Sequence, residues 1–281
     1  MSISPYRFLD SGNEQKLELF GDYYLIRPAS QAIWKPQSPS DWKHDALFSR
    51  EKGKEWTYRQ SLPQSWVNLL EGFQFKVSLT DFGHVGLFPE HARFWPWMEQ
   101  ILKKCKERPK VLNLFAYSGG ATIAAAAAGA SVCHVDASKG MVAWASENAT
   151  LNRLQDAPIR WIVDDVLKFV KKEIRRKNTY DAIILDPPSF GRGSKGEVFK
   201  IERDLLPLLN HCSQLLSDKP LFVLLSCHTP GFSPYTLHHL LDSIMQKTEG
   251  KIEMGEMLLS PSNEKYYSLP SGVYAKWQSH S

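Results

Sequence analysis

The chain has 281 residues, of which 43% are hydrophobic and 23% charged. This ordinary globular composition excludes a disordered chain. The length excludes a small disulfide-stapled domain and, at about 150 residues per domain, predicts two domains. Basic residues (34) exceed acidic residues (30), and the resulting net charge of +4 does not by itself establish a polyanionic partner. Six of the nine tryptophans precede residue 110, which indicates two differently built halves.

Cysteine spacing and hydropathy define the expected compartment. The cysteines form no CxxC pair, which argues against a structural zinc site and a disulfide framework. Free thiols are typical of a reducing, cytoplasmic setting. No stretch reaches about 18 uninterrupted apolar residues, so no membrane span is expected. His44, His84 and His91 lack the spacing of metal ligands, and no metal is expected.

The first 80 residues mix short apolar runs with Gly, Pro, Asn, Asp and Ser. Residues 73–79 alternate strictly between apolar and polar, the pattern of a half-buried strand. We therefore expect a small β-rich domain over residues 1–80, with a possible role in presenting substrate. Its tryptophans could stack on bases, although aromatic residues of a small β domain are more often buried.

From about residue 90 the pattern changes to alternating helices and strands. A helix is expected at 92–107. Strands are expected at 110–115, 131–135, 159–163, 180–185 and 221–226, and helices at 121–128, 139–152, 166–177, 201–216 and 234–248, with two shorter strands following. Such βαβ repetition predicts an α/β domain with a mainly parallel sheet over residues 81–281.

Acidic residues end several of these strands. Gly119 and Gly120 follow the first strand and begin a helix, so that backbone amides can meet a ligand without Cβ clashes. The turn is not GxGxxG, which disfavours a pyrophosphate cofactor. Asp136 ends the second strand, where its carboxylate can accept from both hydroxyls of a ribose. Asp164 and Asp165 end the third strand and Asp186 the fourth, so these acids share the carboxyl edge of the sheet, where open α/β sheets bind ligands.

This ordered set resembles a class I S-adenosylmethionine-dependent methyltransferase. More narrowly, it resembles the family containing the large-subunit ribosomal RNA cytosine-C5 methyltransferases. The motifs that carry the resemblance are Gly86-Leu87-Phe88-Pro89-Glu90, Phe115-Ala116-Tyr117-Ser118-Gly119-Gly120, Asp164-Asp165-Val166, Asp186-Pro187-Pro188-Ser189-Phe190, Ser226-Cys227 and Pro270-Ser271-Gly272-Val273-Tyr274. Two departures from the family are expected: the chain should lack the family's N-terminal RNA-binding domain of the pseudouridine-synthase-associated (PUA) type, and His228 follows Cys227 where a small polar residue is more usual.

The resemblance implies a Rossmann-like fold, a seven-stranded sheet with helices on both faces, and S-adenosylmethionine as cofactor. It implies that Asp136 holds the ribose and that Asp165, or else Asp164, accepts from the adenine amino group. The full expected cofactor set is Phe88, Glu90, Phe115, Ala116, Tyr117, Ser118, Gly119, Asp136, Ala137, Asp164, Asp165 and Asp186.

Two chemistries compete for the methyl-transfer step: methylation of cytosine C5 through a Cys nucleophile is the expected reaction, and methylation of an exocyclic amine of a base is the alternative. In the first, Cys227 adds to C6 of cytosine so that C5 can attack the methyl group. In the second, the motif beginning at Asp186 accepts from an exocyclic amine and aligns it with the methyl group, while Phe190 stacks on the base. Cys227 could instead be a small buried residue. The expected catalytic residues are Asp186, Pro187, Pro188, Phe190 and Cys227.

Basic residues supply candidate contacts to RNA, with ribosomal RNA as the expected substrate. Residues 191–200 are interpreted as a mobile basic lid that carries Arg192, Lys195 and Lys200. The basic run at 168–177 could also hold phosphates of the RNA, or it could be a solvated helix face. Methylation of a protein or small molecule remains an alternative, as does an RNA assembly factor that binds the cofactor without turnover. The sequence leaves open whether the protein is a monomer or a homodimer.

Overall fold

A computed structural model describes residues 4–50, 53, 55–193 and 196–280. The chain forms two compact units, of which the first comprises Met1–Ala92 with Leu258–Ser271 and the second Arg93–Met257 with Gly272–Ser281. The structure thus groups residues 81–92 with the first unit. Division into functional domains at residue 80 stays a prediction.

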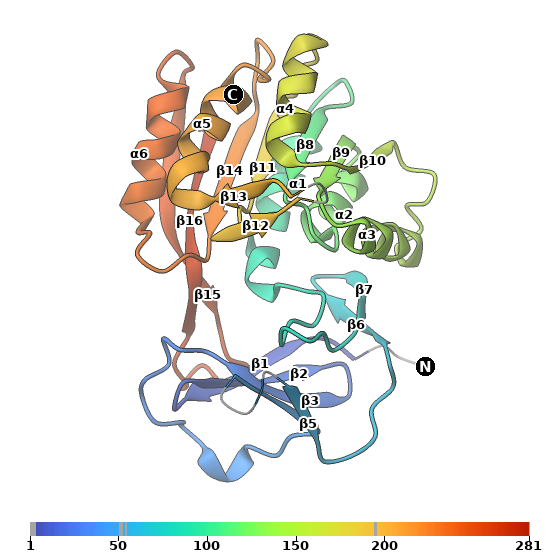
Figure 1. Ribbon diagram of the computed structural model, residues 1–281, viewed down its shortest axis with the longest axis vertical. Coiled ribbons are helices and arrows are strands. Elements are labelled where there is room, and N and C mark those ends of the chain that lie inside the picture. Colours follow the sequence, from blue (N-terminus) through green and yellow to red (C-terminus); the bar gives the residue numbers. More distant parts are fainter. Residues whose placement is uncertain (1–3, 51–52, 54, 194–195, 281) are drawn as a thin grey trace. The chain divides into compact units, whose positions relative to one another are not determined.

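The first unit is rich in β-strands, as expected (Figure 1). Its main sheet has the order β1-β2-β3-β4-β5, and a separate hairpin pairs β6 with β7. These strands are β1 (Arg7–Gly12), β2 (Gln15–Phe20), β3 (Tyr23–Pro28), β4 (Ala46–Ser49), β5 (Glu55–Tyr58), β6 (Trp66–Leu70) and β7 (Phe73–Val77). The alternation predicted at 73–79 is confirmed, because Phe75 and Val77 are fully buried while Gln74 and Lys76 are half-buried.

The tryptophans of the first unit serve its packing. Each indole N–H donates to an acceptor within the unit: Trp34 to the Ser11 carbonyl at 2.9 Å, Trp56 to that of Thr80 at 2.8 Å and Trp66 to that of Phe20 at 2.8 Å. Trp42 donates to Asp10 Oδ2 at 2.9 Å. The four side chains are half-buried, and because every indole N–H has its partner inside the unit, these rings act as structural residues of the small sheet.

The second unit contains a seven-stranded sheet with the order β10-β9-β8-β11-β14-β16-β15. The first five strands in this order run parallel, and β16 pairs antiparallel with β14. The strands are β8 (Lys110–Leu114), β9 (Ser131–Asp136), β10 (Ile159–Val163), β11 (Ala182–Leu185), β14 (Phe222–Cys227), β15 (Gly250–Leu259) and β16 (Leu269–Ser279). The mainly parallel α/β sheet is confirmed, although the last two strands are long rather than short.

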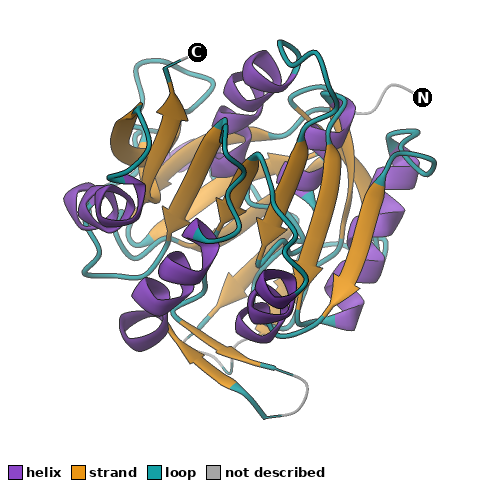
Figure 2. Cartoon of the chain, turned by 90° about the horizontal axis from the view of Figure 1, so that it is seen from above, coloured by secondary structure: helices purple, strands orange, loops and turns teal. Residues whose placement is uncertain are grey.

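Helices cover both faces of this sheet (Figure 2). Three of them, α1, α2 and α3, pack in succession, as do α4, α5 and α6. Their bounds are α1 (Trp95–Leu102), α2 (Gly120–Ala127), α3 (Lys139–Leu151), α4 (Val166–Arg175), α5 (Ile201–Ser213) and α6 (Pro234–Met245). No helix in the described part of the chain is both long and apolar enough to cross a membrane.

Two local expectations are wrong. The helix predicted at 92–107 is a 3-10 helix, η2 (Pro89–Phe94), followed by α1, which ends at Leu102 because its buried face ends there and Lys103 and Lys104 are exposed. The loop expected at 191–200 is a hairpin in its described residues, with β12 (Phe190–Arg192) paired antiparallel to β13 (Val198–Lys200), and its role as a mobile basic lid stays a prediction. Another 3-10 helix, η1 (Pro39–Asp41), lies in the first unit.

Candidate functional site

The loop after β8 takes an unusual backbone path. Phe115, Tyr117 and Gly119 adopt left-handed conformations, with φ of 55°, 50° and 89°. A Cβ on Gly119 would lie 2.9 Å from the Ala145 Cβ, so close packing of α3 against this loop requires glycine. Asn148, on the same helix, donates 3.0 Å to the Ser118 carbonyl. Sequence reasoning missed Asn148, which holds the predicted cofactor loop in place.

Asp136 lies at the end of β9, beside this loop. Its Oδ2 accepts from the Tyr117 N–H at 2.9 Å and its Oδ1 from the Ser138 N–H at 2.8 Å. Burial raises the pKa of Asp136, while these two hydrogen bonds act in the opposite direction. Each carboxylate oxygen has a second lone pair, so the group can still accept from hydroxyls of a bound nucleoside. Ala137 follows directly, half-buried at the start of the turn into α3.

The two acids after β10 have different partners. Asp165 is the N-cap of α4 and accepts from the Lys168 N–H at 2.9 Å. Asp164 accepts from Lys172 Nζ at 2.5 Å, and its backbone N–H donates to the Asp136 carbonyl at 3.1 Å. This last bond joins the end of β10 to the end of β9, so Asp136, Asp164 and Asp165 lie along one edge of the sheet, as the sequence predicts.

Asp186 follows β11, and its carboxylate is tied to the neighbouring strand β14. Ser226 Oγ donates 2.8 Å to Asp186 Oδ1, and His228 Nε2 lies 3.6 Å from the same oxygen. The parallel register, with Leu185 opposite Leu225, brings Asp186 and Ser226 side by side at the carboxyl edge. Ser189, later in the same motif, pairs with Thr229 at 2.7 Å. Asp186 and Ser189 are therefore fixed to the end of β14 and to the residues that directly follow it.

Cys227 is the last residue of β14, and its side chain belongs to the hydrophobic core. The residue is 1% exposed, and Sγ accepts from the Thr229 N–H at 3.4 Å. Burial raises the pKa of the Cys227 thiol, so the neutral form dominates.

The β12–β13 hairpin leaves the sheet edge directly after the Asp186 motif. Phe199 is buried and packs against Phe115, with ring centroids 5.1 Å apart, which fixes the hairpin against the cofactor loop. Phe190 is 49% exposed, with the Arg192 guanidinium 5.7 Å from its ring centre. Arg192 and Lys200 are exposed, whereas Lys195 lies outside the described residues. Within the basic helix α4, Lys168 pairs with Glu197.

Phe88 and Glu90 belong to the first unit. Phe88 is half-buried and makes an edge-on contact with His84 at 5.3 Å between ring centroids, while Glu90 is 5% exposed in η2. Their part in cofactor binding stays a prediction. Sequence reasoning missed a buried charge cluster in this unit, in which Glu18 accepts from Arg27 Nε at 2.7 Å.

The residues along the carboxyl edge of the second unit fit S-adenosylmethionine. Carboxylates at the ends of β9 and β10 suit the hydroxyls and the amino group of an adenosine. The left-handed loop, with glycine required at 119, brings backbone groups to the amino end of α2.

Comparisons with known proteins agree with this geometry. A family model described as S-adenosylmethionine-dependent methyltransferase matches residues 33–244. The crystal structure of a SAM dependent methyltransferase from Agrobacterium tumefaciens is 38% identical, with a TM-score of 0.93, over 99% of this chain and 91% of that one. A methyltransferase solved in complex with SAH is 21% identical, with a TM-score of 0.77, over 99% of this chain and 76% of its own, a likeness of fold alone.

The chain belongs to the S-adenosylmethionine-dependent methyltransferase family, and S-adenosylmethionine is its cofactor. Among curated relatives, the Ribosomal RNA large subunit methyltransferase K/L of Hahella chejuensis is 37% identical over 165 residues, which are 57% of this chain and 22% of that protein. The chain spans between 22% and 33% of the length of these K/L relatives.

Proposed function

We propose that this protein transfers a methyl group from S-adenosylmethionine to a nitrogen of a base in RNA, with Asp186 holding the acceptor. The observation that carries this proposal is the Asp186 carboxylate at the carboxyl edge, fixed by Ser226 and followed four residues later by the exposed ring of Phe190. A methyl-acceptor site needs both a hydrogen-bond acceptor for the amine and a surface on which the base can stack.

The residues of this motif have separate roles in the transfer. S-adenosylmethionine supplies an electrophilic methyl group on a sulfonium centre. Asp186 accepts a hydrogen bond from the amine of the base and so directs the nitrogen lone pair toward that methyl group. Pro187 and Pro188 restrict the backbone after Asp186, which limits the orientations of its carbonyl and carboxylate. When the new C–N bond forms and the C–S bond breaks, Asp186 can take the proton that the nitrogen loses.

Methylation of cytosine C5 through Cys227 is the competing chemistry. The location of Cys227, one residue after Ser226 on the strand next to β11, favours this chemistry. However, the reaction needs a thiolate that can reach C6 of the base, and the Cys227 thiol is buried with a raised pKa. This contrast in exposure between Cys227 and Phe190 makes nitrogen methylation the better-supported reaction.

The relatives' names and the local charge support RNA as the substrate. The K/L relatives are named as methyltransferases of the large ribosomal subunit RNA, so ribosomal RNA in the cytoplasm is the proposed target. Arg192 and Lys200 on the hairpin are exposed cations that can contact phosphates near the site. The first unit, over residues 1–80 and beyond, would help present this RNA.

The decisive experiment is nucleoside mass spectrometry of ribosomal RNA incubated with the protein and S-adenosylmethionine carrying a labelled methyl group. We expect label on one base nitrogen, abolished in Asp186→Ala and retained in Cys227→Ala. Label on cytosine C5 would establish the competing chemistry. Label on protein or small molecules alone would contradict an RNA substrate, and SAM binding without any transfer would indicate an assembly factor.

A further inference from the structure

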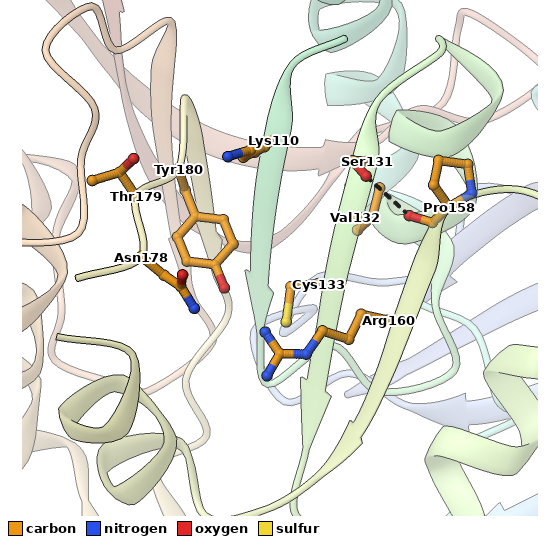
Figure 3. A pocket seen from close by; sticks show the side chains of 9 residues that line it. All are labelled: Lys110, Ser131, Val132, Cys133, Pro158, Arg160, Asn178, Thr179 and Tyr180. Atoms are coloured by element: carbon orange, nitrogen blue, oxygen red, sulfur yellow. Dashed lines mark hydrogen bonds between the residues drawn. The ribbon is translucent and has the colours of Figure 1, made fainter. Parts of the chain in front are cut away.

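A cationic pocket lies at the amino edge of the seven-stranded sheet, at the opposite ends of the strands from the acidic carboxylates. Its volume is about 220 Å³ (Figure 3). Lys110 and Ser131 begin β8 and β9, Pro158 and Arg160 lie at the start of β10, and Tyr180 precedes β11. The remaining lining residues are Val132, Cys133, Asn178 and Thr179. The two charged residues of this lining, Lys110 and Arg160, are both cations.

A buried carboxylate under the pocket holds its donors in place. Glu173 on α4 is 0% exposed and accepts from both terminal nitrogens of Arg160, at 3.1 and 3.3 Å. It also accepts from Asn178 at 2.9 Å, Tyr180 at 2.7 Å and Arg176 at 2.9 Å. Two guanidinium groups thus meet one carboxylate, so the cluster keeps a net positive charge. In Figure 3 the Arg160 guanidinium is turned toward Cys133 and Tyr180.

Further cations flank the pocket along the chain. Exposed basic residues precede Lys110 in the segment leading into β8, and others precede Asn178 at the end of α4. They are Lys104, Lys106, Arg108, Arg175, Arg176 and Lys177. The acids near these positions in sequence are Glu107, Asp156, Asp181 and the buried Glu173. One of them, Asp181, already accepts from the Lys110 backbone N–H at 2.8 Å and from Ser217 Oγ at 2.7 Å.

The charges of the second unit therefore differ between the two edges of its sheet. The carboxyl edge carries Asp136, Asp164, Asp165 and Asp186, beside the hairpin cations Arg192 and Lys200 that are proposed to contact phosphates near the acceptor. Cations predominate at the amino edge. At about 3.3 Å per residue, a five-residue strand such as β8 separates the two edges by roughly 13 to 17 Å. A structured RNA extends much further than this, whereas a short oligonucleotide occupying the acceptor site does not.

We propose that the amino-edge pocket binds a phosphate group of the RNA backbone, and that the flanking cations extend it into a second RNA-binding surface remote from methyl transfer. Lys110 and the N–H groups of Arg160 and Asn178 that are not donated to Glu173 offer charged and neutral donors in a recess, which is the chemistry that phosphate oxygens need. This inference rests on the proposed RNA substrate and adds to it a contact surface that the relatives' names do not describe.

The test compares two charge-matched triple variants. Arg108→Gln, Lys110→Gln and Lys177→Gln remove cations at the pocket while leaving Arg160 on Glu173. Lys139→Gln, Lys247→Gln and Lys251→Gln remove the same charge from exposed positions of the second unit that do not line the pocket. Binding of a structured ribosomal RNA fragment is measured between 50 and 200 mM salt, together with S-adenosylmethionine affinity and methylation of a short oligonucleotide.

We expect the RNA affinity of the pocket variant to fall at least tenfold. Its plot of log affinity against log salt should be shallower by about 0.7 for each phosphate that the variant no longer neutralises. Cofactor affinity and methylation of the short oligonucleotide should stay within twofold of the parent, and the control variant should keep the parent's salt dependence. An equal fall in both variants, or an unchanged affinity in the pocket variant, would overturn the proposal.

Titration with inorganic phosphate separates this inference from the proposed function. If the parent binds no RNA, the proposed substrate is wrong, and phosphate binding that disappears in Lys110→Gln would still support the phosphate pocket. Absence of phosphate binding in that case would overturn the pocket as well. If phosphate binds but the pocket variant retains full RNA affinity, the site serves a free phosphate compound, and the RNA surface is refuted.

Discussion

The Ser226 hydroxyl donates a 2.8 Å hydrogen bond to Asp186 Oδ1, joining the ends of β11 and β14 at the candidate acceptor site. This bond restricts rotation of the carboxylate, which the proposed chemistry uses to aim an amine at the methyl group. A charge-assisted hydrogen bond of this kind contributes roughly 1.5 to 3 kcal/mol.

We therefore expect Ser226→Ala to lower kcat about tenfold or more while changing cofactor affinity less than twofold. Steady-state kinetics with RNA and calorimetry with S-adenosylmethionine measure the two effects. Ser217→Ala is the matched control, because Ser217 makes a similar 2.7 Å bond to Asp181 at the opposite edge of the sheet. An equal fall of kcat in both variants would remove the positioning role of Ser226.

Cys227→Ala should retain methyl transfer within about threefold. The thiol is buried in the core and its pKa is raised by that burial, so the substitution removes a small apolar group rather than a nucleophile. Cys212→Ala serves as the control, since Cys212 is also 1% exposed and has no proposed chemical role. Selective loss of turnover in Cys227→Ala would restore the cytosine-C5 mechanism.

Asp136→Ala should weaken S-adenosylmethionine binding at least tenfold. The variant lacks the proposed ribose acceptor and the partner that holds the Tyr117 N–H, so it affects both the binding of the ligand and the loop. Calorimetric titration measures the change. Asp156→Ala, at an exposed loop position, should bind like the parent. An undiminished affinity in Asp136→Ala would contradict the ribose assignment.

The burial of His134 predicts that the folded protein loses stability in mild acid. It is fully buried, its Nδ1 lies 2.9 Å from Thr122 Oγ1, and burial lowers its pKa to about 3. The unfolded chain binds this proton near pH 6.5, whereas the folded chain does not, so stability falls as pH drops from about 6.5 toward 3. The slope for one such group reaches about 1.4 kcal/mol per pH unit.

Urea unfolding at pH 7, 6 and 5 tests this slope in a range above the usual pKa of carboxylates. The parent should lose stability over this range, and His134→Gln should show a smaller dependence on pH even if it is less stable at pH 7. The same dependence in both proteins would mean that His134 does not cause it.

The order of elements and the location of the acids could be predicted from local sequence. Hydrophobic periodicity separated helices from strands, and acids directly after consecutive strands lie at the carboxyl edge because parallel strands share their direction. Asp136, Asp164, Asp165 and Asp186 were found in this way. The helix expected at 92–107 failed because its charged end, after Leu102, has no face to bury.

What the sequence alone determined was therefore the α/β class, the methyltransferase family and the edge of the sheet that carries the acidic residues. Only the tertiary structure decided how those residues can act. It buried Cys227, exposed Phe190, joined Ser226 to Asp186, and gathered Lys110, Arg160 and Asn178 around one recess. These properties depend on contacts between strands and helices far apart in the chain, and burial, which sets the reactivity of a thiol, is a property of packing rather than of residue order.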